Sequence, residues 1–374
     1  MNNWGMTLQF FMATMLAFSV SKHQGINMIQ PWRATCMQLY CNLVNSARNR
    51  DEAMVIVNRS LDRWITLMRG VVRDGGGRNL LLFPEFCLTG FPLGESAAEW
   101  IDKACIEIPG PVTERLQREA QNLKIWIGAN SYERDPTWPG RYFNCSYLIN
   151  PSGDVVLKYR RINTVQTGSP HDFMDKYLAR YGIEGTFPVA KTELGNIAMM
   201  PCGEIMYPEA SRMFMLRGAE VLLHPTSDHG AADKWSWESA KKVRASENMM
   251  YLISANQTGQ IGGALPQGQT MGHSHIYDWD GRVLADSGGP GESTVCSDWI
   301  DVEALRRIRA IPGSGNRLLR QRLDIYRPLY NSITLYPPNS FADAPMDSKA
   351  RILEVQQKAY ENLVKAGVIT RSGQ

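Results

Sequence analysis

The sequence predicts an α/β protein in which helices cover mixed β-sheets from the outside. Short apolar runs that suit strands buried on both faces alternate along the chain with longer helical segments. Two pairs of expected strands are separated by tight turns, Pro-Ser-Gly-Asp at 151–154 and Asp-Gly at 280–281. Such hairpins join antiparallel strands, whereas strand–helix–strand units join parallel ones, so the sheets should contain both arrangements.

Helices are expected where apolar residues recur at steps of three and four. The first, over 51–68, has one apolar stripe made of Met54, Val57, Leu61, Trp64, Ile65 and Met68. Four further segments are expected to be helical: 112–123, 208–217, 235–250 and 348–366. The expected strands are short β-prone runs between them: 34–43, 80–83, 125–129, 144–150, 155–161, 196–200, 221–224, 251–255, 274–279 and 282–285.

The two ends of the chain differ from its middle. Residues 7–20 carry no charge but are too few to span a membrane. No Lys or Arg precedes them, so we expect an N-terminal arm over 1–32, with a targeting segment as the alternative. Near the other end, the Pro-Pro pair at 337–338 interrupts regular structure, and a C-terminal extension ending in a helix is expected over 331–374. Residues 33–330 should form the main domain.

Composition excludes several classes of protein. The 374 residues are 44% hydrophobic and 21% charged, which is ordinary for a globular protein. The formal net charge of +3 gives no electrostatic case for binding nucleic acid or an anionic membrane. The seven cysteines are odd in number and include no CxxC pair, so neither a disulfide framework nor a zinc cluster is expected. The corresponding expectation is a reducing, cytoplasmic location.

Glu85 is the first of three candidate catalytic residues. It stands at the end of the apolar run 80–83, directly after Pro84. Apolar surroundings raise the pKa of a carboxyl group toward the range that suits a general base. A carboxylate that caps a turn is the alternative, and this stretch alone does not decide between the two.

Arg161 is the second candidate. Side chains alternate between the two faces of a strand, which places Arg161 on the same side as the apolar Leu157 and Tyr159. It should therefore point inward, whereas Lys158 and Arg160 point the other way. The alternative is an ordinary basic strand end.

Cys202 is the third candidate, because it falls between an expected strand and an expected helix. Backbone N–H groups at such a turn can lower the pKa of a thiol and bind a developing oxyanion. A lone cysteine is more often a small buried apolar residue, and that interpretation is kept for the other six.

These stretches together resemble the nitrilase superfamily of carbon–nitrogen hydrolases. The resemblance covers roughly residues 33–330 and rests on motifs in the same order: FPEFCLTG (83–90), KYRR (158–161), PCGEIMYPEASR (201–212), GAEVLLHP (218–225), VRASEN (243–248) and GHSHIYDWDGRVL (272–284). It implies an αββα sandwich that pairs into an αββααββα dimer and often assembles further. It also implies catalysis by a Glu base, a Lys and a Cys nucleophile, without a cofactor.

Residue roles follow from the same resemblance. Glu85 matches the base, Cys202 matches the nucleophile, and Glu184 matches a second Glu near the site. The run IEGTFP at 183–188 is similar to a segment of aliphatic amidases and formamidases. Tyr207 and Gly203, which follow the nucleophile, are expected to contact substrate. The implied reaction is hydrolysis of a small amide through a Cys thioester.

One position departs from the family pattern, because Arg161 stands where KYRK ends in the catalytic Lys. Arg stabilises an oxyanion but cannot deliver a proton, since its pKa is above about 12. A guanidinium could also pair with Glu85 and lower the pKa of that carboxyl group. We therefore expect a changed substrate preference, a slower enzyme or a loss of activity. Lys158 would take the place of Arg161 only if the strand register slipped by one residue.

Several alternatives remain open on sequence alone. A nitrilase is one, although such enzymes usually carry Trp directly after the cysteine, where this chain has Gly203. An N-carbamoyl hydrolase is another, and a catalytically impaired binding or assembly protein is a third. His273 and His275 lie two apart on an expected strand, but no acidic or Cys partner is evident. No metal site is expected there.

Overall fold

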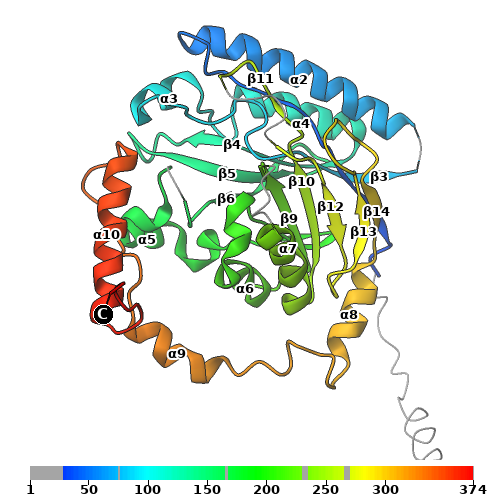
Figure 1. Ribbon diagram of the computed structural model, residues 1–374. Helices are drawn as coiled ribbons and strands as arrows, with labels where there is room; N and C mark the ends of the chain where they lie inside the picture. The colour runs from blue at the N-terminus through cyan, green and yellow to red at the C-terminus, as the bar shows by residue number, and fades with distance from the viewer. Residues whose placement is uncertain (1–27, 75, 165–166, 230–234, 265–269, 374) are drawn as a thin grey trace, which may run out of the picture.

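The computed structural model describes residues 28–373 except 75, 165–166, 230–234 and 265–269 (Figure 1). Within these residues, two six-stranded sheets lie face to face and helices cover their outer sides. The α/β class expected from the alternation of strands and helices is confirmed. The N-terminal arm expected over 1–32 falls almost wholly outside the described residues.

The first sheet has the strand order β14-β1-β3-β4-β5-β6. Its strands are β1 (Trp32–Cys36), β3 (Arg78–Leu82), β4 (Trp126–Arg134), β5 (Tyr142–Ile149), β6 (Val155–Arg160) and β14 (Ser297–Ile300). β1, β3 and β4 run parallel, whereas β4, β5 and β6 are antiparallel neighbours. The hairpin expected at 151–154 is therefore present, and β14 adds an antiparallel edge that the sequence did not predict.

The second sheet has the order β13-β12-β10-β9-β8-β7. Its strands are β7 (Ala190–Thr192), β8 (Gly195–Met199), β9 (Val221–Thr226), β10 (Tyr251–Asn256), β12 (His275–Tyr277) and β13 (Val283–Asp286). β8, β9 and β10 run parallel, and the outer strands run antiparallel to their neighbours. Both sheets are thus mixed, as the combination of hairpins and crossovers predicts.

The strand expected over 34–43 is divided in two. β1 ends at Cys36, and β2 (Cys41–Asn42) pairs instead with β11 (Gln260–Ile261) in a separate small sheet. Gln38 lies between them and binds the loop that connects β13 and β14. Its side-chain amide donates to the carbonyl groups of Gly289 and Gly291 at 3.1 and 2.8 Å. This long-range contact is not visible in the local sequence.

Helices cover the two outer faces of the sandwich (Figure 1). The helices of the described residues are α2 (Arg50–Arg73), α3 (Ala97–Lys103), α4 (Pro111–Leu123), α5 (Met174–Thr186), α6 (Pro208–Leu216), α7 (Trp235–Asn248), α8 (Val302–Ala310), α9 (Leu323–Ser332) and α10 (Lys349–Lys365). α2 and α4 lie over the first sheet, and α6 and α7 lie over the second. The layer order is therefore helix, sheet, sheet, helix.

The longest of these helices, α2, forms where the apolar stripe predicts it. The side chain of Asn49 accepts a hydrogen bond from the backbone N–H of Glu52 at 3.0 Å and caps the first turn. The buried stripe packs on the sheet, where Trp64 stacks on Phe83 with ring centroids 4.0 Å apart. This contact anchors the end of the strand that leads to Glu85.

A layer of apolar side chains fills the space between the sheets, and Gly128 of β4 lies within it. A Cβ at this position would come 2.8 Å from Cδ1 of Leu82 and 3.2 Å from Cδ1 of Leu223, which belongs to the other sheet. Those distances are shorter than ordinary carbon–carbon contacts. The missing side chain therefore permits the close approach of β4 and β9.

Beyond α8 the chain leaves the sheets and forms an outlying arm (Figure 1). α9 has no buried residue, and its Ile325, Leu329 and Tyr330 side chains are exposed. Ile352 and Val355 of α10 pack with Phe341 and Met346 in a separate small cluster. The domain boundary expected at residue 330 falls inside α9.

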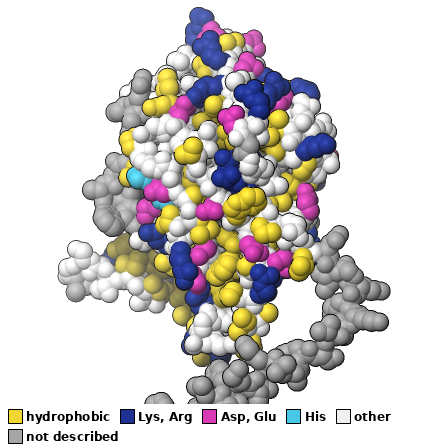
Figure 2. Space-filling view, turned by 90° about the vertical axis from the view of Figure 1, so that its right-hand side faces the viewer, with side chains coloured by type: hydrophobic (Ala, Val, Ile, Leu, Met, Phe, Trp, Pro, Cys, Tyr) yellow, Lys and Arg dark blue, Asp and Glu magenta, His cyan; other side chains and the backbone are white. Residues whose placement is uncertain are grey.

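The face that carries β13 and β14 is viewed in Figure 2. Hydrophobic side chains are interspersed there with acidic and basic ones. Val283, Val295 and Trp299 are among the exposed apolar residues of these strands and the loop between them. Among the residues that the structure describes, no helix combines the length and apolar character needed to cross a bilayer.

Candidate active site

Glu85, Arg161 and Cys202 meet at one end of the sandwich. Glu85 and Arg161 follow β3 and β6 of the first sheet, whereas Cys202 follows β8 of the second. All three line a cavity of about 470 Å³. Its other lining residues are Phe86, Phe91, Tyr132, Asn144, Thr167, Gly203, Met206, Tyr207, Ser227, His229 and Trp237. The volume lies within the range of small-molecule sites, and the two sheets supply the carboxylate and the thiol from opposite sides.

The Glu85 carboxylate is buried and accepts hydrogen bonds at both oxygens. Asn144 donates from Nδ2 to Oε1 at 2.7 Å, and the Ser227 hydroxyl donates to Oε2 at 2.6 Å. Nη1 of Arg161 lies 3.5 Å from Oε1, a single contact and not a bidentate pair. Burial raises the pKa of Glu85, against the opposing effects of Arg161 and the hydrogen-bond donors. The guanidinium therefore does not depress this pKa below its ordinary value.

The backbone of Cys202 makes a sharp turn into the 3-10 helix Cys202–Met206. Its φ of +51° lies in the left-handed region, which costs a non-glycine residue about 1 kcal/mol. The Cys202 carbonyl lies 2.9 Å from Nε2 of His224, and Nδ1 of His224 lies 2.9 Å from Oγ of Ser254. Because a carbonyl only accepts, Nε2 carries the proton. Burial lowers the pKa of His224 to about 4, so a neutral imidazole holds the turn.

The Cys202 thiol faces the Glu85 carboxylate. Oγ of Ser227 links the two groups, because it lies 3.8 Å from Sγ of Cys202 and donates to Oε2 of Glu85 at 2.6 Å. Burial and the charge of Glu85 raise the pKa of the thiol to about 12, against the attraction of Arg161. The expectation of a thiol pKa lowered by backbone N–H groups is therefore wrong, because desolvation and the neighbouring carboxylate dominate. At neutral pH the Cys202 side chain is therefore a protonated thiol.

Side-chain alternation along β6 sets the direction of Arg161. Leu157 and Tyr159 of β6 face the core, and Arg161 continues on that side to reach Glu85. Lys158 and Arg160 face the other way, where both pair with the buried Glu133 at 2.7 and 2.6 Å. The strand register is unshifted, and Lys158 does not reach the cavity.

A second buried carboxylate, Glu204, fixes the turn that carries Arg161. Its Oε1 accepts from the backbone N–H groups of Ile162 and Asn163 at 3.1 and 2.8 Å. Its Oε2 accepts from the Tyr159 hydroxyl at 2.8 Å. Burial raises the pKa of Glu204, and the charge of Arg161 opposes this effect. The guanidinium thus offsets part of the desolvation cost of two buried carboxylates.

Glu184, the expected second catalytic Glu, lies outside this cavity. Its side chain is 65% exposed and pairs with Arg217 at 3.1 Å. The residues before it form α5, where Tyr181 packs against Trp138, and this helix carries Glu184 to the surface. The sequence-based placement is therefore corrected: Glu204 is the second buried carboxylate beside Arg161.

Tyr207 and Gly203, the expected substrate-binding residues, both line the cavity. A Cβ at position 203 would come 3.0 Å from the Trp237 ring and 3.2 Å from Nη2 of Arg161. Glycine therefore leaves room for the indole and the guanidinium to approach the nucleophile. The segment between Arg161 and α5 also reaches the cavity, through Thr167.

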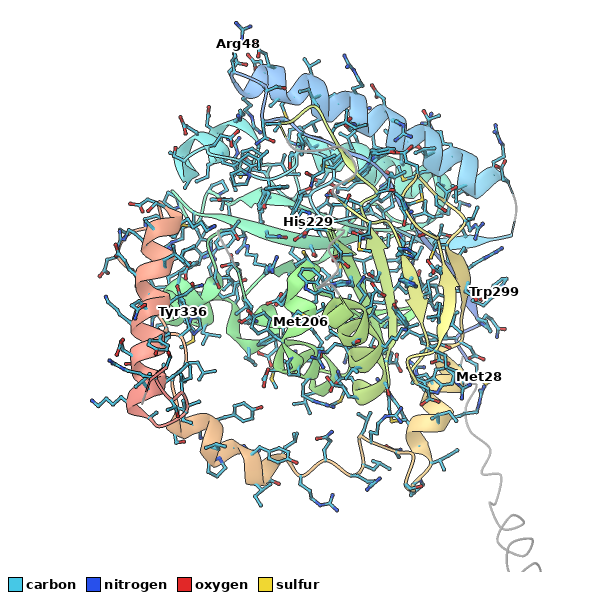
Figure 3. The ribbon with its side chains drawn as sticks, in the orientation of Figure 1. Met28, Arg48, Met206, His229, Trp299 and Tyr336 are labelled. Carbon is cyan, nitrogen blue, oxygen red and sulfur yellow. The ribbon has the colours of Figure 1, made fainter. Side chains whose placement is uncertain are left out.

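The rest of the wall is largely aromatic and apolar. Phe86 stacks on Tyr132 with ring centroids 5.6 Å apart, and Phe86 also contacts Phe91 at 5.5 Å. Met206 and His229, both labelled in Figure 3, lie near the middle of the molecule and line the same cavity. Such a wall favours small ligands with few charges.

Sequence reasoning missed four residues that shape the site: Asn144, Glu204, His224 and Ser227. Glu204 and His224 lie inside motifs that carry the family resemblance, so a signal was present for them. Asn144 and Ser227 lie at strand ends, where nothing local marks them as partners of Glu85. Their roles depend on pairing between distant strands.

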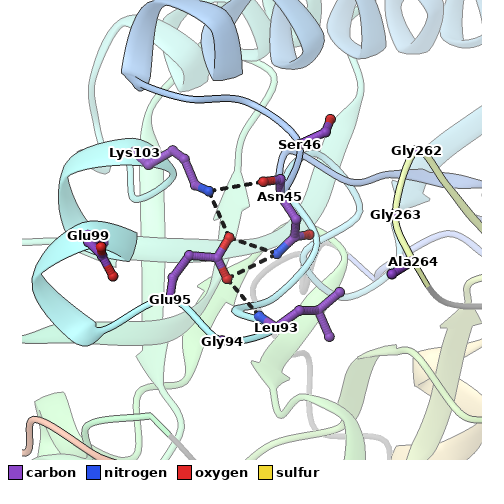
Figure 4. A pocket seen from close by; sticks show the side chains of 10 residues that line it. All are labelled: Asn45, Ser46, Leu93, Gly94, Glu95, Glu99, Lys103, Gly262, Gly263 and Ala264. Carbon is purple, nitrogen blue, oxygen red and sulfur yellow. Dashed lines mark hydrogen bonds and ion pairs between the residues drawn. The ribbon is translucent and has the colours of Figure 1, made fainter.

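A second cavity, of about 580 Å³, lies between the turn at Asn45 and the loop before α3 (Figure 4). Nζ of Lys103 bonds Oε1 of Glu95 at 2.7 Å and the Asn45 carbonyl at 3.2 Å. Its cation and this carboxylate therefore neutralise each other. No cysteine lines this cavity among the described residues, and the catalytic candidates belong to the first one.

Comparison with known proteins identifies the family. The model of the family described as "Carbon-nitrogen hydrolase" matches residues 56–310, which include Glu85, Arg161 and Cys202. The chain belongs to the carbon–nitrogen hydrolase family. It is thus an enzyme of the nitrilase superfamily, as the ordered motifs imply.

Characterised members of the carbon–nitrogen hydrolase family include amidases similar to this chain. A formamidase of Pseudomonas syringae pv. tomato is 26% identical over 250 residues, which cover 66% of this chain and 67% of the relative. The omega-amidase NIT2 of Xenopus tropicalis is 25% identical over 255 residues, covering 68% and 87%.

Solved structures of carbon–nitrogen hydrolases share the fold. An enzyme from Helicobacter pylori G27 has a TM-score of 0.62 at 22% identity, covering 80% of this chain and 98% of that one. An amidase from Nesterenkonia sp. AN1 has a TM-score of 0.55 at 18% identity, covering 82% and 99%. That structure is of a Glu-to-Gln mutant, in which the acetamide moiety of fluoroacetamide is covalently added to the active-site cysteine.

Proposed function

We propose that this carbon–nitrogen hydrolase is an amidase that releases ammonia from a small amide through a thioester on Cys202. One observation carries the proposal: Glu85, Arg161 and Cys202 line one cavity, where Ser227 lies between the carboxylate and the thiol and Arg161 contacts the carboxylate. The amidases among the relatives support the same class of substrate.

In the first half-reaction, Glu85 takes the thiol proton as the Cys202 sulfur attacks the amide carbon. A base is needed because the resting thiol has a pKa of about 12. The oxyanion is stabilised by Arg161 and by the Gly203 N–H, which lies in the first turn of a 3-10 helix. Protonated Glu85 then gives its proton to the departing nitrogen, so ammonia leaves and the thioester remains.

In the second half-reaction, Glu85 takes a proton from water as the water oxygen attacks the thioester carbon. The carbon–sulfur bond breaks, the proton returns to the Cys202 sulfur, and the carboxylic acid is released. The sum is amide plus water giving acid plus ammonia. Glu204 positions Arg161 throughout by holding the turn after β6, and Ser227 keeps Glu85 oriented toward the sulfur.

The cavity supports an uncharged substrate. Among its described lining residues, Arg161 is the sole Lys or Arg, and it faces Glu85. The walls include the aromatic rings of Phe86, Phe91, Tyr132, Tyr207 and Trp237, and the volume of about 470 Å³ suits a short aliphatic amide. An N-carbamoyl amino acid would add a carboxylate that needs a further cation, so it is the weaker candidate. A nitrile hydrolysed by the same thiol is the second candidate.

We expect ammonia release from a panel of short aliphatic amides, with slower or no turnover of matched nitriles and N-carbamoyl amino acids. Iodoacetamide, which is itself a small amide, should alkylate Cys202 selectively because the other cysteines are buried outside the cavity. Mass spectrometry of tryptic peptides identifies the labelled cysteine. Turnover confined to nitriles or carbamoyl compounds would reassign the substrate, and neither turnover nor selective labelling would indicate an impaired member.

We also propose that a second copy of the chain covers α9. Ile325 and Leu329 are 75% and 66% exposed, and α9 has no buried residue, so this helix lacks the contacts that stabilise an isolated segment. Light scattering should therefore give at least twice the chain mass of 42.1 kDa. Ile325→Asp with Leu329→Asp should lower that mass, whereas Val295→Asp on another exposed face should not. A monomeric wild type would contradict the proposal.

A further inference from the structure

His273, His275 and Asp286 gather at one end of the β12–β13 hairpin. His275 pairs with Asp286 across the antiparallel register, and His273 lies two residues earlier. The two imidazoles are nearly parallel, with ring centroids 6.0 Å apart. No acidic partner for these histidines was expected, and the hairpin corrects this by placing the Asp286 carboxylate opposite His275.

The distances between these groups match those of ligands around one metal ion. Oδ1 of Asp286 lies 3.4 Å from Nδ1 of His273, and Oδ2 lies 3.3 Å from Nε2 of His275. All three ligand atoms lie within 4.8 Å of one another. Tetrahedral ligands held 2.0–2.1 Å from Zn²⁺ are about 3.3–3.5 Å apart. Two imidazoles and a carboxylate also form a donor set that zinc commonly takes.

Glu238 of α7 contacts His275 at Nδ1, the ring nitrogen that does not face Asp286. Its Oε2 lies 3.5 Å from Nδ1 of His275, a buried nitrogen without a hydrogen-bond partner among the described residues. His275 itself is only 7% exposed. Lys241 and the Tyr277 hydroxyl bind Glu238 at 2.8 and 2.9 Å and hold it in place. A metal-bound imidazole usually directs its other nitrogen to such a carboxylate.

We propose that His273, His275 and Asp286 form a binding site for Zn²⁺, with Glu238 orienting His275. The fourth position of the tetrahedron is left for solvent, since the side chains of His273 and Asp286 are each 41% exposed. This site is separate from the thiol chemistry of Cys202 and does not depend on the proposed amidase reaction.

The site joins the hairpin to the helix beside the catalytic cavity. Lys241 bridges Glu238 and Asp228, at 2.8 and 2.6 Å. Asp228 directly follows Ser227, and Trp237, which lines the cavity, directly precedes Glu238. Bound zinc would therefore brace α7 against β12 and β13, and this bracing should raise the thermal unfolding midpoint.

The test is zinc binding to the full-length protein after dialysis against a chelator. Isothermal titration with Zn²⁺ should give one site per chain, and Co²⁺ should give the visible absorption of a tetrahedral complex. His273→Ala and Asp286→Asn should each weaken binding by at least about 100-fold, and Glu238→Gln by about 10–100-fold. His171→Ala, which removes a histidine elsewhere, should bind as wild type.

Circular dichroism checks that each variant is folded, which is expected because His273 and Asp286 are partly exposed. Absence of saturable Zn²⁺ binding by the wild type would overturn the site. Unchanged affinity in His273→Ala and Asp286→Asn would assign the metal to other residues and overturn it equally. Unchanged affinity in Glu238→Gln alone would remove Glu238 from the proposal.

Discussion

Replacing Cys202 with Ala should abolish amide hydrolysis, with a loss of at least about 10⁴-fold in kcat. The thioester cannot form without the sulfur, and the structure describes no other cysteine in the cavity. Cys202 is nearly buried and its side chain is small, so removal of one atom should leave the fold intact. Initial rates of ammonia release, measured with circular dichroism as the folding control, give the comparison.

Cys202→Ser is the matched variant, because it keeps a hydroxyl nucleophile beside Glu85 at nearly the same volume. A serine hydroxyl is a weaker nucleophile and a poorer leaving group than a thiol, so slow or absent turnover is expected. The label from iodoacetamide should disappear in both variants. Full turnover by Cys202→Ala would exclude the thioester mechanism altogether.

Replacing Arg161 with Met should lower kcat by about 10²–10³-fold, because the oxyanion loses its cation. The same change should shift the acid limb of the pH profile. Burial already raises the pKa of Glu85, and Arg161 is the largest influence that lowers it. Without this cation the pKa rises further, so the base is protonated at a higher pH. Activity should therefore disappear at a higher pH than in the wild type as the solution is acidified.

The stability of Arg161→Met should depend on pH with a definite sign. Glu85 and Glu204 would then be buried without a cation between them, at a cost of about 3 kcal/mol at neutral pH. A carboxyl group whose pKa is raised by folding binds more protons in the folded state than in the unfolded state. The free energy of unfolding of the variant should thus fall as the pH rises through those pKa values. Urea titrations at pH 5 and pH 8 measure the difference.

Arg161→Lys tests whether position 161 needs only a positive charge or the guanidinium group itself. The lysine restores the cation to the family pattern and should recover most of the rate and the position of the acid limb. If Arg161→Met showed neither the rate loss nor the shift, Arg161 would have no part in the reaction. If Lys were no better than Met, the Arg161 Nε bond to the Asn163 carbonyl at 2.8 Å would be the feature that matters.

The local patterns around Glu85, Arg161 and Cys202 each left an ordinary structural alternative open, and the ordered motifs shared with the nitrilase superfamily singled these residues out. Each also stands at a strand end, which fixes the direction of its side chain, and the structure brings the three to one cavity. Glu184 could not be placed in this way. Its position depends on how the aromatic residues of α5 pack, which local patterns do not contain.

Electrostatics were harder to predict than geometry. The pKa of the Cys202 thiol depends on burial and on Glu85, which belongs to the other sheet. A local argument from backbone N–H groups therefore gave the wrong direction for the shift of the thiol pKa.

Asp286 is a different case, because the expected hairpin strand ended one residue short of it. Extending that strand by one pair would have brought His275 and Asp286 together.

The layer around Gly128 has a consequence for the reaction. Around Gly128, contacts of side chains such as Leu82 and Leu223 set the separation of the two sheets. The distance between the Glu85 carboxylate and the Cys202 sulfur consequently depends on the thickness of the apolar layer between the sheets. A methyl group added at Gly128 would push the two sheets apart and so separate Glu85 from Cys202. It would thereby act on turnover although it is remote from any reacting atom.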